Sequence, residues 1–530
     1  MKNFFFIAMT ILPAMLLLSS CDRGLVNEGA DVLYKDDLPV EHGMMSLGEK
    51  LDDPYTVENM TRAYQALYPT KARTDIIASD LYVRFLPYTQ EQYDYLESLG
   101  LELLDHPVDY RIVREGDWYH DPSVPEGDIT WQYAVVPADF HFPASIVHEI
   151  LDECYIAEHV PTRASDVDWA AVEREAFRQT GNADLLQPAS RGGADCPTGC
   201  ITIIDDLLDG GTQIPVTGVK VAVNSFVKVS TAFSDEQGRY RITRNYSGKV
   251  RYRLVFKNKR GFGIGLNMLL LPGSVSTLGT GTPEGKSVVV SVSSDRKLWT
   301  RCIANNAAYD YYAWCDDEDS GVLTPSKTLR MWLVDILPDS CAPMARQGAL
   351  LSIAALEALL SEELGEYAGL LNVFFPDIII GTKGAEGYAQ VYSVVWHELA
   401  HASHYEKVGN EYWNKYILFI LSSFVSSGGT AYGTGHEKDA GICAVGEMWA
   451  YYMQTALVNA RYGITSYTAG TGYWFHPQIL LYMSERGMKP GQFFKAMDSS
   501  VESVDDLRAS LLDLYPEFKT VIRQAFERYE

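Results

Sequence analysis

The sequence predicts a multidomain protein with an α+β N-terminal domain, a β-sandwich in the middle and a mainly α, α+β domain at the C-terminus. Its 530 residues are too many for one ordinary hydrophobic core, and at about 100–200 residues per domain they indicate about three domains. A stretch rich in Gly, Pro, Ser and Asp, from Pro188 to Gly199, marks a linker. Short alternating segments follow the linker, and helical periodicity dominates from about residue 296.

Residues 1–21 have the pattern of a secretory signal. Lys2 precedes an apolar stretch from Phe4 to Leu18, and small residues lead to Cys21. The apolar stretch is shorter than the ~20 residues that a helix needs to cross a bilayer. The segment therefore predicts export rather than a membrane span.

The end of this segment, Leu18-Ser19-Ser20-Cys21, resembles the lipobox of bacterial lipoproteins. The resemblance implies that Cys21 is diacylated and becomes the first residue of the mature chain. Lipid on Cys21 would then be the only attachment to a membrane, in the cell envelope and at the outer membrane, with the periplasmic or surface face left open. The alternative is an ordinary cleaved signal that ends in an accidental cysteine. The polar residues 22–49 are interpreted as a flexible tether.

The overall charge excludes one class of partner. The chain has 44 basic and 69 acidic residues, which give a net charge of -25. Such a field repels phosphate backbones and anionic lipid headgroups. We therefore expect no nucleic-acid partner.

Seven cysteines follow Cys21, and an exported compartment permits disulfides. An odd number leaves at least one thiol free or paired outside the chain. Cys196-x-x-x-Cys200 lacks a second pair or a nearby histidine, so it is a weak metal signal. A local disulfide or two buried thiols are the expected states of this pair.

Residues 50–190 form the expected N-terminal α+β domain, of unknown role. The pattern predicts helices at Val57 to Leu67, Gln90 to Leu99 and Ala144 to His159, and a strand at Asp80 to Leu86. The histidines of this region lack ligand spacing and are interpreted as surface or core residues: His106, His120, His141, His148 and His159.

Residues 200–290 form the expected sandwich of antiparallel strands. An Asp235-x-x-Gly238-x-Tyr240 turn lies between two strands, and Gly238 can take the positive φ that the turn requires. Together with the preceding strands, this turn resembles the carboxypeptidase-regulatory-like, transthyretin-type sandwich found beside many bacterial surface enzymes. The resemblance implies a spacer or docking module without chemistry of its own. The expected strands are Ile201 to Ile204, Val216 to Val223, Lys228 to Phe233, Arg239 to Ile242 and Val250 to Phe256.

Residues 296–530 form the expected C-terminal domain. A strand shortly before a long helix recurs in zinc peptidases, so this region is where we expect the active site. The predicted strands are Thr328 to Val334 and Asp377 to Gly381, and the predicted helices are Lys297 to Trp314, Ala345 to Gly369, Ala385 to Lys407, Gly441 to Leu457 and Pro477 to Arg486.

The chemistry of the chain is indicated by His397-Glu398-Leu399-Ala400-His401. On a helix, histidines four residues apart project from one face and can bind one zinc ion. Glu398 is rotated by about 100° from His397, which suits a general base beside the metal. With eleven histidines in the chain, a chance match has an expectation on the order of 0.02. The alternative is a structural histidine pair with a bystander glutamate.

Zinc in a catalytic site needs a third protein ligand and an open position for water. The segment Ala444 to Ala450 resembles the third-ligand helix of the gluzincins. This resemblance implies a zincin-like C-terminal domain with Glu447 as the ligand, and Gly446 and Ala450 are small enough for a close helix approach. The rival ligands are Glu437, His436 and His404, of which His404 lies about 10 Å along the helix axis from His397 and suits the cleft wall better.

Two further roles, the orientation of a zinc-bound histidine and hydrogen-bond donation to the oxyanion, have no single candidate residue. Many gluzincins carry an aspartate four residues after the third ligand, which orients a zinc-bound histidine, but Tyr451 occupies that position here and leaves the orienting partner open. The tetrahedral oxyanion also needs a donor. Tyr473 and His476 are candidates by type and position and Tyr432 is another, although each also suits a structural role.

These observations predict a zinc-dependent peptidase of the cell envelope, acting on a peptide or protein substrate outside the cytoplasm. Lipobox and domain order resemble envelope lipoproteins of the Bacteroidetes. Two alternatives stay open: an inert surface binding or adhesion lipoprotein that retains a zincin fold, and a zinc amidase that acts on cell-wall peptides.

Overall fold

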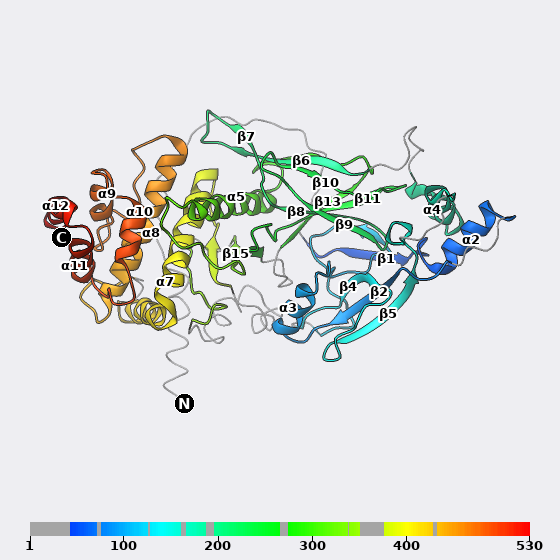
Figure 1. Ribbon diagram of the computed structural model, residues 1–530, viewed down its shortest axis with the longest axis horizontal. Coiled ribbons are helices and arrows are strands. Elements are labelled where there is room, and N and C mark those ends of the chain that lie inside the picture. Colours follow the sequence, from blue (N-terminus) through cyan, green and yellow to red (C-terminus); the bar gives the residue numbers. More distant parts are fainter. Residues whose placement is uncertain are drawn as a thin grey trace.

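The protein is described by a computed structural model in which helices and several small, separate sheets alternate along the chain. The α+β class is therefore confirmed. The elements from β1 to α4 lie at one end of the elongated molecule, the helices α8 to α12 lie at the other, and strands β6 to β14 lie between them (Figure 1). The described residues are 43–70, 76–125, 128–160, 166–186, 196–265, 274–335, 337, 339–349, 376–427 and 432–529.

The signal segment, Cys21 and most of the tether lie outside the described residues. The end of the segment assigned to the tether, residues 46–49, belongs to strand β1 (Ser46–Lys50), which pairs with β3 (Tyr110–Arg114). Within the described parts of the chain, no helix has the length and apolarity needed to cross a membrane.

Three predicted elements of the N-terminal region are confirmed. Helix α2 (Val57–Leu67) begins after Thr56, whose side chain accepts a hydrogen bond from the Asn59 amide. Strand β2 (Asp80–Leu86) is followed by α3 (Gln90–Ser98), which Thr89 caps in the same way. Each cap satisfies an amide that the first turn of a helix leaves without a partner.

The helix expected from Ala144 to His159 is wrong. Strand β5 (Val147–Cys154) lies there and pairs with β2, which also pairs with β4 (Gln132–Pro137) on its other edge. Without β5, one edge of β2 would leave its amides and carbonyls unpaired. The hydrogen bonds between β5 and β2 therefore outweigh the helical spacing of the apolar residues in this segment. Helix α4 (Trp169–Gln179), which the sequence pattern did not predict, follows.

Four of the five strands expected in the middle region are confirmed, whereas the strand expected from Val216 to Val223 begins only at Lys220. The strands form two small sheets, and the expectation that all of them pair antiparallel is wrong, because β14 (Val288–Val290) pairs with β6 (Thr198–Asp205) in parallel. A turn carries the chain from β9 in one sheet to β10 in the other; there Gly238 has φ 73°, and a Cβ on it would lie 2.3 Å from the Ile201 carbonyl. The positive φ predicted for Gly238 is thus confirmed. One sheet contains β6 (Thr198–Asp205), β7 (Thr212–Pro215), β10 (Arg239–Arg241) and β14 (Val288–Val290), and the other contains β8 (Lys220–Ser225), β9 (Lys228–Phe233), β11 (Val250–Val255) and β13 (Val275–Gly281).

The local disulfide considered for Cys196 and Cys200 is not formed. Both thiols are free and partly exposed, and so are neither bonded to each other nor fully buried. The Cys196 thiol donates to Asn245 Oδ1, while the Cys200 thiol donates to the Gln237 carbonyl. The two side chains therefore have separate partners.

The C-terminal region is mainly helical, as predicted. A short parallel sheet joins β12 (Gly263–Gly265) of the middle region to β15 (Arg330–Val334) and β16 (Ile378–Gly381), which lie between the first and second long helices of this region in sequence. Residues 350–369 of the helix expected from Ala345 to Gly369 lie outside the described residues, and its first residues, 345–348, form a turn. The helices are α5 (Arg296–Asp316), α7 (Tyr388–Ser427), α8 (Ala440–Tyr462), α9 (Gln478–Ser484), α10 (Pro490–Ala496), α11 (Val504–Leu514) and α12 (Lys519–Tyr529).

The middle sheets and the C-terminal helices share a hydrophobic core. Ile203 of β6, Leu254 of β11, Tyr311 of α5 and Trp449 of α8 belong to one cluster of buried side chains. Strand β12 lies between the middle strands β11 and β13 in sequence but pairs with β15. The helices that carry the candidate site are therefore held by packing from both regions.

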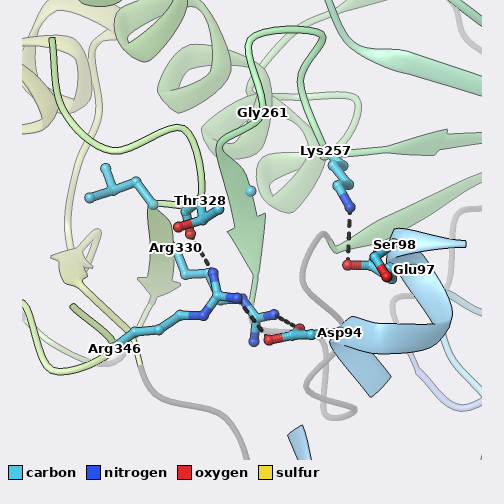
Figure 2. A pocket seen from close by; sticks show the side chains of 10 residues that line it. Asp94, Glu97, Ser98, Lys257, Gly261, Thr328, Arg330 and Arg346 are labelled. Atoms are coloured by element: carbon cyan, nitrogen blue, oxygen red, sulfur yellow. Dashed lines mark hydrogen bonds and ion pairs between the residues drawn. The ribbon is translucent and has the colours of Figure 1, made fainter. Parts of the chain in front are cut away.

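Ion pairs connect α3 to the C-terminal sheet around a hollow of about 240 Å³ (Figure 2). Asp94 Oδ1 lies 2.6 Å from Arg330 Nη2, and Asp94 Oδ2 lies 2.8 Å from Arg346 Nη2. Glu97 Oε2 lies 3.0 Å from Lys257 Nζ. Because these cations already face carboxylates, the hollow is a charged contact between the N-terminal region and the rest of the molecule.

Candidate metal centre

Helix α7 carries His397, Glu398 and His401, as the sequence predicts. Two tryptophans fix it between its neighbours: Trp396 Nε1 donates to the Ala307 carbonyl of α5 at 2.8 Å, and Trp449 Nε1 of α8 donates to the Ala400 carbonyl at 3.0 Å. Helices α7 and α8 lie side by side (Figure 1). The second helix of the expected site is therefore placed against the first by specific contacts.

His397, His401 and Glu447 form a buried group that could bind a metal ion. One ligand atom from each lies within 4.8 Å of the others. His397 Nε2 is 3.5 Å from Glu447 Oε2, and His401 Nε2 is 3.5 Å from Glu447 Oε1. Two ligands at about 2.1 Å from a tetrahedral ion lie about 3.4 Å apart. Each histidine nitrogen therefore lies at about this separation from one oxygen of Glu447.

Buried polar atoms near this group also fit a bound cation. Among the described residues, Glu398 Oε2 and Glu447 Oε2 are buried without a hydrogen-bond partner. A buried carboxylate oxygen without a partner is costly. A divalent cation with a bound water would supply partners for both carboxylates, so the donor set fits a metal.

The two carboxylates have different pKa shifts. Burial would raise the pKa of Glu447, but His401 and His397 hold it well below its usual range. Burial raises the pKa of Glu398 to about 8; His397 opposes this rise, and Glu447 adds to it. A cation between them would favour the ionised form of both side chains.

The rival third ligands have other positions. Glu437 accepts hydrogen bonds from the amides of Thr434 and Gly435 in the loop before α8. His436 is exposed, and neither residue belongs to the metal-binding group of the described chain. Glu447 is the carboxylate that the fold brings to the two histidines.

His404 is buried one turn beyond His401 and also stands outside the group. Its ring lies 5.5 Å from that of Tyr412 and 6.1 Å from that of Trp413. Burial first, and His401 and Lys407 next, lower the pKa of His404 to about 3. The neutral ring is therefore the stable form in this aromatic surrounding.

The side-chain partner of His397 Nδ1 is Gln454, which the sequence pattern did not reveal. Gln454 Oε1 lies 3.1 Å from His397 Nδ1, and Gln454 Nε2 donates to the Tyr467 hydroxyl at 2.7 Å. Gln454 follows Glu447 by seven residues, or two helical turns, and so shares its face of α8. This seven-residue spacing from Glu447 is the feature of the sequence that could have identified Gln454.

Tyr416 is a second missed residue. Its hydroxyl donates to Glu447 Oε1, and its ring lies 5.7 Å from that of His401. It reaches the site because α7 is kinked at Gly409, which has φ 76° and ψ -179°. A Cβ on Gly446 would lie 3.5 Å from the Tyr416 ring, an ordinary contact.

The remaining candidates lie at different distances from the group. Tyr451, in the place of the expected aspartate, sets its ring 4.4 Å from that of His397, edge to face. Tyr473 lies 5.7 Å from Tyr451, and Tyr432 lies 5.2 Å from Tyr473. His476 makes no side-chain hydrogen bond or ring contact with the group among the described contacts. The oxyanion roles of Tyr473 and His476 stay predictions.

Comparison with known proteins adds no relative. No protein-family model, no curated protein and no solved structure matches the chain.

Proposed function

We propose that the protein is a zinc-dependent peptidase that hydrolyses peptide bonds outside the cytoplasm. The observation that carries the proposal is the buried His397, His401 and Glu447 group, in which each histidine Nε2 lies 3.5 Å from an oxygen of Glu447 and one ligand atom of each residue lies within 4.8 Å of the others. Two imidazoles and one carboxylate, with a fourth position open, are a typical donor set of catalytic zinc. Glu398 is buried beside this group with one free oxygen among the described contacts.

In this mechanism the chain moves one proton. When bound, zinc would polarise the substrate carbonyl and acidify a water molecule. Glu398 takes the proton from the attacking water and gives it to the nitrogen of the leaving amine. Tyr473 and His476 are proposed as donors to the developing oxyanion; the ring contacts through Tyr451 support Tyr473.

The finer organisation belongs to the same proposal. A strand before the active-site helix and a third ligand on the next long helix support a zincin-like C-terminal domain of gluzincin type. The two middle sheets, with the Gly238 turn between them, support a transthyretin-type sandwich that acts as a spacer. Lipid on Cys21 would hold the protein in the cell envelope as its only membrane contact, and the charge of -25 disfavours nucleic-acid partners.

The proposal is tested on protein that lacks the first 21 residues. Zinc content, measured by mass spectrometry, is compared between wild type, His397→Ala and Glu447→Ala, and peptide-library cleavage is compared between wild type and Glu398→Gln. We expect one zinc per wild-type chain, loss of zinc in both ligand variants, and loss of cleavage with retained zinc in Glu398→Gln. Absence of zinc from wild type after reconstitution would overturn the proposal.

The same assays separate the two alternatives. Bound zinc with turnover of muropeptides and none of protein substrates would indicate a cell-wall amidase. Bound zinc without turnover of either substrate class would indicate a binding lipoprotein. The free Glu398 oxygen favours an enzyme, since a binding protein has no need of a buried base at that place.

A further inference from the structure

The two ring nitrogens of His397 have different partners. Nε2 lies 3.5 Å from Glu447 Oε2, on the side of the proposed metal, and Nδ1 lies 3.1 Å from Gln454 Oε1. A histidine that binds a metal through Nε2 must carry its proton on Nδ1. Gln454 must then present its carbonyl oxygen to His397, which leaves its amide nitrogen to donate to Tyr467.

We propose that Gln454 is the positioning residue of the metal site, and that its neutral amide selects the His397 tautomer that leaves Nε2 free. The inference rests on the proposed function, because it assumes that the group binds a metal. His397 and Gln454 are both buried, so water cannot easily replace the lost partner. Outer partners of this kind are worth about 10–100-fold in metal affinity.

Gln454 brings no charge, in contrast to the aspartate that many gluzincins use for the same purpose. A carboxylate would raise the basicity of His397 and hold the metal more tightly. The neutral Gln454 adds no negative charge behind His397. The metal site of this chain is therefore more positive, and binds its ion less tightly, than a site with a carboxylate in that place.

A purely structural role for Gln454 predicts a different result. Its contact with Tyr467 also ties the loop after α8 to that helix. Asn459 makes a similar tie without touching the metal group, because its Nδ2 donates to the Tyr467 carbonyl at 2.9 Å. Asn459→Leu is therefore the matched control: it loosens the same loop and leaves His397 oriented.

The test measures zinc affinity by competition with a chelator, together with the visible spectrum of the cobalt-substituted protein. We expect Gln454→Leu to weaken zinc binding about 10–100-fold and to alter the cobalt bands. Gln454→Glu retains the acceptor and is expected to bind zinc as tightly as wild type or more tightly. Asn459→Leu should match wild type in both measurements.

Two outcomes would overturn the inference: wild-type zinc affinity in Gln454→Leu, or an equal loss in Gln454→Leu, Gln454→Glu and Asn459→Leu. The melting temperature of each variant without metal shows whether it is folded. Failure of the proposed function is distinguishable, because zinc affinity is read without cleavage. Wild type that binds zinc and cleaves nothing would sink the peptidase proposal and leave the role of Gln454 standing.

Discussion

Each ligand of the candidate metal centre is held by a different kind of contact. His397 faces the amide of Gln454, and Glu447 accepts from the hydroxyl of Tyr416. The ring of His401 lies beside those of Trp413 and Tyr416, at 5.8 and 5.7 Å. Buried side chains need such partners because each free rotamer costs conformational entropy when the metal binds. These contacts therefore orient the three ligand side chains before a metal ion binds.

Removal of the Tyr416 hydroxyl tests this orientation. We expect Tyr416→Phe to weaken zinc binding by roughly tenfold, because Glu447 loses a donor while the ring against His401 remains. Chelator competition measures the effect. Tyr412→Phe is the control, since the Tyr412 hydroxyl donates to the Val501 carbonyl at 3.0 Å, away from the ligands. Equal affinity of the two variants would contradict the role of Tyr416.

At the scale of elements, α7 consists of two helical segments that meet at a kink. Its first segment carries both histidines, and its second segment returns Trp413 and Tyr416 to the ring of His401. Gly409 separates them with φ 76° and ψ -179°, a conformation that residues with a Cβ rarely adopt. A straight helix would carry Tyr416 away from the site, since it follows His401 by about four turns.

Gly409→Ala should therefore destabilise the protein by about 1–3 kcal/mol. A Cβ there would meet no atom within 4 Å, so the cost arises from the backbone and not from a clash. Urea unfolding measures it, and zinc affinity should fall with it if the second segment shifts. Gly472→Ala, also in open space but without a positive φ, is the control. A Gly409→Ala variant as stable as this control would rule out the kink as a constraint.

At the scale of the whole molecule, buried charges join the N-terminal region to the middle sheets. Arg251 of β11 donates to His106 Nε2 at 2.7 Å and pairs with Glu115 at 3.0 Å, while His106 Nδ1 lies 2.7 Å from Asp105. Lys228 of β9 is buried between Glu158 and Glu173, at 2.7 and 2.9 Å. Such pairs are stable only while each partner keeps its charge state.

His106 makes this contact sensitive to acid. Burial first, opposed by Asp105 and reinforced by Arg251, lowers its pKa to about 4, whereas the unfolded value is about 6.5. Between these values the unfolded chain binds more protons, so stability is full above about pH 6.5 and falls as the pH drops towards 4. We expect a loss of about 2 kcal/mol between pH 7 and pH 5 from this residue.

Urea unfolding of metal-free protein at pH 7 and pH 5 measures this loss. His106→Gln should show a smaller decrease than wild type, because glutamine does not titrate. His141→Gln, at an exposed position, should keep the wild-type decrease. The same pH dependence in all three proteins would show that His106 does not carry it.

The sequence alone determined the features that depend on local spacing. The helical His397 and His401 pair, the strands of the middle region and the positive φ of Gly238 follow from patterns a few residues long. Helix periodicity and turn chemistry act between near neighbours, so a single sequence displays them. The segment Ala444 to Ala450 predicts Glu447 as the third ligand although it lies far from the two histidines in sequence, and the structure brings the three side chains together.

Only the tertiary structure decided the contacts between distant segments. Gln454 meets His397 across 57 residues, Tyr416 reaches Glu447 through a kink, and β5 became a strand because β2 offered a free edge. The thiols of Cys196 and Cys200 likewise donate to Asn245 and to the Gln237 carbonyl, which lie far from them in the sequence. Burial and hydrogen-bond satisfaction are properties of the packed molecule, and residues far apart in the chain can satisfy them in many combinations that local patterns do not distinguish.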